Sequence, residues 1–274
     1  MPELLGPTLL PLAFGLIVGL ILALSGAGGG ILGVPLLVTG LNLPMTQAGP
    51  VGLFAVFLSA GLGALLGWRQ GKLRYRAALL IGGIGLLLTP VGIHLAQQLP
   101  DRLLLIIFSL LLLWTARRMY RQGRPAATSD IELNHKFPCR KQSDTGRLRW
   151  TRPCALVLSL TGAVSGLLSG LLGVGGGFVI VPALTWFSDL PPRHILATSL
   201  GVMTLVALGG ILAAGIHGSL LWPIALPFAA GAIPGLLLGR RLAARYPALN
   251  LHTSFASICL LAAGLLLFRA SQIA

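Results

Sequence analysis

A glycine-rich segment that could hold an anion occurs twice in the chain. The first copy runs from Gly26 to Leu37 and the second from Gly173 to Leu184, and adding 147 to each number of the first gives the second. Glycine lacks a Cβ, so such a segment can interrupt a helix and leave main-chain N–H groups open to a ligand. A helix that restarts after the break directs its free amides and positive dipole end at the gap. The sequence therefore predicts two anion-binding helix breaks.

The candidate binding residues are the glycines of these breaks and the hydroxyls near them. We expect substrate contacts from Ser25, Gly26, Gly28, Gly29, Gly30, Gly173, Gly175, Gly176, Gly177, Thr198 and Ser199. Pro35 and Pro182 follow the glycines at the same distance in both copies and are expected to help break the helices. The plainer interpretation is that glycines allow close helix packing and hydroxyls cap or connect helices. Duplication of the whole motif favours a binding site, while the hydroxyls fit either interpretation.

The composition predicts an all-α integral membrane protein. Mean hydropathy is +0.89, and charged residues make up only 9% of the chain, against roughly 25% in soluble domains. Several apolar stretches reach the roughly 20 residues that a spanning helix needs. The stretches lie at 7–40, 47–67, 77–98, 102–116, 154–187, 195–216, 221–243 and 249–268.

The first and fifth apolar stretches are too long for one ordinary span, and each contains the glycine motif. We expect each to form two helical pieces, 7–25 with 30–40 and 154–172 with 177–187. The predicted organisation is two homologous four-segment repeats, each with a glycine-broken first helix. Residues 1–116 form the first membrane repeat, 117–152 a basic cytoplasmic loop, and 153–274 the second membrane repeat.

The distribution of basic residues favours inverted repeats. Ten of the 20 Lys and Arg residues lie in 117–152 and four more in 69–76, so both loops should be cytoplasmic. If each glycine-broken segment enters the membrane and returns, only Arg102 and Arg269 lie outside. A single crossing instead would place five arginines outside: Arg102, Arg193, Arg240, Arg241 and Arg245. The net charge of +14 is explained by this topology, and no basic stripe with interleaved aromatics indicates nucleic-acid binding.

Acidic and metal-binding residues are sparse. The six carboxylates fall near segment ends or in loops, at Glu3, Asp101, Asp130, Glu132, Asp144 and Asp189, which argues against a cationic substrate. The three cysteines have no paired spacing and are expected to be free thiols. One Cys and one His in the central loop do not make a zinc site. We expect no metal and no cofactor.

The chain resembles the TauE/SafE family of bacterial membrane permeases, which are named for export of sulfite and organosulfonates. The paired Gly-x-Gly-Gly-Gly-x-x-x-Val-Pro segments carry the resemblance, together with Ala197-Thr198-Ser199-Leu200 and the two four-segment halves. The first half departs from the pattern, with Pro50-Val51-Gly52 where Gly-Thr-Ser would stand. The resemblance implies a multi-pass permease of the bacterial inner membrane that handles small, often sulfur-containing anions.

The predicted function is therefore transport of sulfite or another sulfur-containing oxyanion or organosulfonate. Alternating access would occur around the two glycine-rich breaks. The expected partners are a small anion and the lipid bilayer, and the sequence leaves the oligomeric state open. The alternatives are an intramembrane enzyme that transfers lipid or phosphate, an anion channel, and a structural membrane subunit. An enzyme would need a base or nucleophile cluster near the glycines, and only Ser25 stands there in the first copy.

Overall fold

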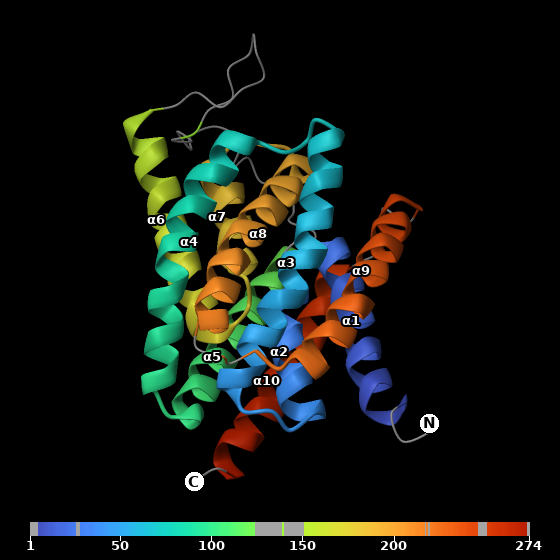
Figure 1. The fold of residues 1–274 in the computed structure, drawn as a ribbon. Coiled ribbons are helices and arrows are strands. Elements are labelled where there is room, and N and C mark those ends of the chain that lie inside the picture. The colour runs from blue at the N-terminus through green and yellow to red at the C-terminus, as the bar shows by residue number, and fades with distance from the viewer. Residues whose placement is uncertain are drawn as a thin grey trace.

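The computed structural model describes residues 5–25, 28–123, 139, 151–216, 218, 220–245 and 251–272. Ten helices make up almost all of this part of the chain (Figure 1). They are α1 (Leu5–Ser25), α2 (Gly28–Gly40), α3 (Met45–Arg69), α4 (Tyr75–Gln98), α5 (Asp101–Gly123), α6 (Arg152–Leu172), α7 (Gly177–Phe187), α8 (Pro192–Ile216), α9 (Trp222–Arg245) and α10 (Leu251–Gln272). Among the described residues the only extended pairing is an isolated bridge between Cys139 and Ser188.

The predicted all-α membrane architecture is confirmed. Six described helices are long and apolar enough to cross a membrane, namely α1, α3, α4, α6, α8 and α9. Their outer faces carry many large apolar side chains, such as Leu87 and Leu156, which are 72% and 67% exposed. Such faces suit lipid, since a bilayer solvates apolar side chains and leaves backbone hydrogen bonds to the helix itself.

The two long glycine-containing stretches each form two helices, as predicted. α1 ends at Ser25 and α2 starts at Gly28, while α6 ends at Leu172 and α7 starts at Gly177. α2 folds back along α1, because Gly29 lies against Leu22 and Gly40, at the far end of α2, lies against Phe14. Later residues of α2 therefore meet earlier residues of α1, which makes the pair an antiparallel helical hairpin.

Helices of one half of the chain pack on helices of the other half. α1 packs on α9 and α4 packs on α6, and Figure 1 shows these pairs on opposite sides of the bundle. Between them α3 packs against α8, with Gly61 beside Thr204 and Gly67 beside Ala197. Because the residue number rises along α3 as it falls along α8, these two helices run antiparallel. α5 packs on α10 in the same bundle.

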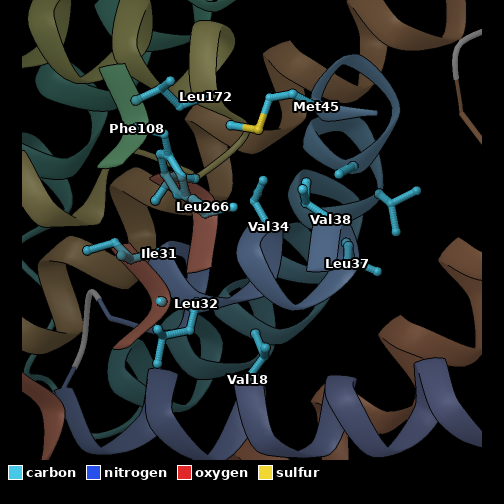
Figure 2. Close-up of a cluster of buried hydrophobic side chains, with 14 of the residues drawn as sticks. Val18, Ile31, Leu32, Val34, Leu37, Val38, Met45, Phe108, Leu172 and Leu266 are labelled. Atoms are coloured by element: carbon cyan, nitrogen blue, oxygen red, sulfur yellow. The ribbon is translucent and has the colours of Figure 1, made fainter. Parts of the chain in front are cut away.

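The short helix α2 lies in the interior and supplies much of the core. Figure 2 shows its side chains among residues of α1, α3, α5, α6 and α10. The fully buried members include Ile31, Val34, Leu37, Phe108 and Leu266. A helix too short to span the bilayer is thus held by packing against its longer neighbours.

Two features of the central region differ from expectation. α5 continues to Gly123, so the first part of the predicted 117–152 loop is helical. The prediction of three free thiols is wrong for two of them, because Cys139 and Cys154 form a disulfide and only Cys259 is free. Their spacing in sequence did not indicate this pairing. The main chain at Cys139 bonds to Phe187, the last residue of α7, and to Asp189, which brings the Cys139 thiol to the start of α6.

Candidate functional site at the two helix breaks

The two glycine motifs meet inside the bundle. A Cβ built on Gly30, near the start of α2, would overlap the main-chain oxygen of Val174 in the second break. Glycine is required at position 30 because any side chain there would push the two segments apart. Segments far apart in sequence therefore form one site.

The meeting point lies at the middle of the two central helices. A Cβ on Gly175 would be 2.9 Å from Val56 and 3.5 Å from Met203. Val56 is near the centre of α3 and Met203 near the centre of α8. If these helices span the bilayer, the second break lies near its midplane, where many transporters hold their substrates.

The start of α7 offers free main-chain donors at this point. Gly176 is the N-cap residue and has φ 71°, a left-handed conformation that side chains rarely adopt. Its carbonyl accepts hydrogen bonds from the N–H groups of Val179 and Ile180, at 3.0 and 3.3 Å. The amides of Gly177 and Phe178 precede these and have no partner within a helix, as at every helix start. An anion could bind there without a basic side chain.

A small pocket reaches the second break from one end of the bundle. It lies between the start of α3, the end of α4 and the end of α6, and its lining residues are Met45, Thr46, Gly49, Pro50, Leu53, Ile93, Ala96, Gln97, Gly170, Leu171 and Gly173. Gly173 caps α6 in a left-handed conformation and packs against Gly49. The pocket therefore joins the bundle end that holds Met45 and Gln97 to the glycines of the second break.

The opposite end of the bundle, which we call the Arg240 end, has polar contacts between helices. Nη1 of Arg240 donates to the carbonyl of Gly63 at 3.0 Å. Nδ1 of His194 donates to the carbonyl of Lys72 at 2.8 Å. These hydrogen bonds join α9 to α3 and the start of α8 to the turn between α3 and α4.

The structure brings the two predicted breaks together at Gly30. Gly28 begins α2, Gly29 packs on α1 and Gly30 meets Val174, while Gly175, Gly176 and Gly177 lead into α7. Gly26 lies outside the described residues. Ser25 ends α1, and its hydroxyl donates to the carbonyl of Ile21 at 2.8 Å.

The two predicted hydroxyls of α8 lie nearer the Arg240 end. Thr198 Oγ1 accepts from the N–H of Arg74 at 3.2 Å and donates to the carbonyl of His194. Ser199 is buried and donates to the carbonyl of Leu196 at 2.9 Å. Thr198 thus connects α8 to the α3–α4 turn.

The two motif prolines do not end helices. Pro35 lies inside α2 and Pro182 inside α7, so the interruptions are at the glycines. A proline removes one hydrogen bond of a helix, and in both cases the helix continues past it.

Comparison with known proteins identifies the family. A model of the sulfite exporter TauE/SafE family matches residues 11–266. The chain belongs to the TauE/SafE family. It is 34% identical to a probable membrane transporter protein of Xylella fastidiosa, over 85% of this chain and 83% of that protein. It is 29% identical to the probable membrane transporter protein YunE of Bacillus subtilis, over 82% and 84%. A probable membrane transporter protein of Methanocaldococcus jannaschii is 28% identical, over 74% and 72%. No solved structure matches.

This TauE/SafE chain is therefore a multi-pass membrane transporter. Its site also contains residues outside the glycine motif, namely Val56 of α3 and Met203 of α8, which lie against Gly175. They are apolar residues in apolar helices, so nothing in the sequence separates them from lipid-facing or core positions. Only their spatial relation to the glycines marks them.

Proposed function

We propose that the chain is a permease for small anions, with sulfite and other sulfur-containing oxyanions or organosulfonates as its substrates. The observation that carries the proposal is the meeting of the two breaks at Gly30 and Val174. Such a point offers unpaired main-chain amides at the start of a buried helix, which stabilise negative charge. Alternating access around this point would expose the anion to each side of the membrane in turn.

The packing of α3 on α8 supports an inverted-repeat architecture. The two helices occupy the same place in their repeats, and they run antiparallel. A repeat whose central helix is reversed relative to its counterpart has the opposite orientation in the membrane. We accordingly treat residues 1–116 and 153–274 as inverted membrane repeats around the pseudo-equivalent α3 and α8.

The positions of the arginines support an orientation with both termini outside the cytoplasm. Arg269 donates to Asn42 Oδ1 at 3.1 Å, between α2 and α3, and Arg102 is the second residue of α5, at the same end of the bundle. The turn that holds Lys72 and Arg74 lies at the other end of the bundle, opposite the start of α1 and the end of α10 (Figure 1). By the positive-inside rule the second end is cytoplasmic, in the inner membrane of a bacterial cell.

The polar groups near the breaks suit an anion better than a cation or a chemical reaction. The two carboxylates of the described residues are Asp101, which starts α5, and Asp189, which follows α7. No group of three or more His, Cys, Asp or Glu side chains gathers in the described part of the chain. Ser25, the candidate nucleophile of an enzyme, is hydrogen-bonded to its own helix.

Flux measurements with purified protein test the proposal. Proteoliposomes would be loaded with radiolabelled sulfite, and efflux followed with sulfate, thiosulfate or sulfoacetate as unlabelled competitors. We expect saturable flux that sulfur oxyanions inhibit. Flux that rises linearly with concentration would indicate a channel, and absence of flux with every anion would contradict the proposal.

A further inference from the structure

We propose that the hydroxyl of Ser169 binds the transported anion at the second break, so that the two halves of the site differ in polarity. The inference rests on the proposed anion-permease function and names the side chain that recognises the substrate. The main-chain amides at the start of α7 and the Ser169 hydroxyl would bind the same small oxyanion.

The Ser169 hydroxyl is buried without a partner. The residue is 0% exposed, and its Oγ has no hydrogen-bond partner within the protein. Its neighbour one turn earlier, Ser165, is equally buried but donates to the carbonyl of Gly162 at 3.1 Å. A buried hydroxyl without a partner is costly, so its presence in a membrane-embedded helix requires an explanation. A bound anion would supply the missing acceptor.

The position of Ser169 on α6 places it beside the start of α7. A Cβ on Gly176, the N-cap of α7, would be 3.0 Å from the Cβ of Ser165. Ser169 follows Ser165 by four residues, and residues at this spacing share one face of a helix. Ser169 is therefore on the face of α6 that meets the start of α7.

The first repeat has apolar side chains at the corresponding positions. Leu22 corresponds to Ser169 and Val18 to Ser165. Gly29, the counterpart of Gly176, packs directly on the Cβ of Leu22 and on the carbonyl of Val18. The counterpart of Ser169 thus touches the break in the first repeat, where it can offer no hydrogen bond. The polar side of the site belongs to the second repeat.

The pocket described above provides a route to this position. Gly170, in the last turn of α6, and Gly173, the C-cap of α6, line it. An anion that enters between the start of α3 and the end of α4 would reach the break at Gly173 and the residue that follows Ser169 in the sequence. Free amides of α7 would hold one oxygen of the anion, and the hydroxyl would donate to another. The site would therefore favour oxyanions with several acceptor oxygens.

The test compares sulfite flux by Ser169→Ala with that by Ser109→Ala. Ser109 is a matched control, since it is also 0% exposed but its hydroxyl is already bonded to the carbonyl of Leu105 at 2.7 Å. We expect Ser169→Ala to raise KM for sulfite by roughly ten- to a hundredfold with little change in maximal rate, the usual effect of losing a hydrogen bond to a charged group. Ser109→Ala should keep the wild-type KM.

An unchanged KM in a monodisperse Ser169→Ala variant would overturn the inference and leave the permease proposal intact. If the alanine variant does not purify as a monodisperse protein, Ser169→Cys carries the test, because cysteine is close in size and a weaker donor. Its KM should rise by a smaller factor, and a wild-type KM would again overturn the inference. Absence of saturable flux in the wild type would overturn both proposals.

Discussion

The guanidinium of Arg240 in α9 donates a hydrogen bond to the main-chain oxygen of Gly63 in α3. The repeat offset relates Arg240 to Ile93 and Gly63 to Gly210. Ile93 cannot form such a bond, and it lines the pocket at the other end of the bundle. A charged hydrogen bond therefore joins α9 to α3 at one end of the bundle, while the pseudo-equivalent position at the other end lines a pocket.

Removal of this hydrogen bond should weaken the packing of α9 on α3. We expect Arg240→Leu to lower the melting temperature of the purified protein by a few degrees, because one charge-assisted hydrogen bond contributes about 1–2 kcal/mol at a partly exposed site. Arg241→Leu is the control, since Arg241 is adjacent but exposed. Equal melting temperatures for the two variants would show that the Arg240 contact adds no stability.

The close approach of the two breaks predicts a strong effect of the smallest side chain. Gly30→Ala should abolish transport, because its methyl group would overlap the Val174 carbonyl and force the breaks apart. Gly83→Ala in α4 is the matched control, since nothing lies within 4 Å of the added Cβ, and alanine favours a helix. Sulfite flux in proteoliposomes gives the comparison. Normal flux in Gly30→Ala would mean that the breaks need not touch.

The antiparallel register of α3 and α8 can be tested by cross-linking. A Cβ on Gly61 would be 3.4 Å from Cγ2 of Thr204, so Gly61→Cys and Thr204→Cys should form a disulfide on mild oxidation. In a parallel arrangement of the repeats Gly61 would instead face Leu208. Mass spectrometry of peptides detects the cross-link, and the Gly61→Cys, Leu208→Cys double variant serves as the control. A stronger cross-link in that control would contradict the packing described here.

The Cys139–Cys154 disulfide closes a loop of sequence separation 15 and should add stability. A loop of this length gives roughly 3 kcal/mol in the chain-entropy model, so oxidised wild-type protein should melt several degrees above Cys154→Ser. Treatment with a reductant should remove this difference in melting temperature, because it breaks the disulfide of the wild type and leaves Cys154→Ser unchanged. If the oxidised wild type melts at the same temperature as Cys154→Ser, the disulfide either does not form or does not stabilise the protein.

The sequence was sufficient for the helices and for the break glycines, because apolar length and a duplicated motif are local signals. It could not show that Thr198, which is predicted to contact the substrate, accepts a hydrogen bond from the main chain of Arg74. It also could not reveal the Cys139–Cys154 bond, since the pairing depends on where the end of α7 holds Cys139. Both cases depend on contacts between distant segments, which hydropathy and spacing do not encode.

The distinction between Ser169 and Ser165 was equally hidden. Both are serines one turn apart in α6, and their surroundings in sequence are alike. Only the hydrogen bond from Ser165 to Gly162, and its absence at Ser169, separates them. Such a difference arises from side-chain rotamers and neighbouring helices.

The packing of α1 on α9 has a consequence for synthesis. Gly15 and Gly19 of α1 lie against Phe228 and Ala232 of α9, which the ribosome adds about two hundred residues later. Until then the face of α1 that carries Gly15 and Gly19 has no partner helix. α4 likewise lacks its partner α6 until α6 is made, although the stretch of chain between them is shorter. A ribosome that has completed only the first half of the chain has therefore not yet made α9 and α6, the helices on which α1 and α4 pack. The packing of α1 cannot be complete until α9 has been synthesised.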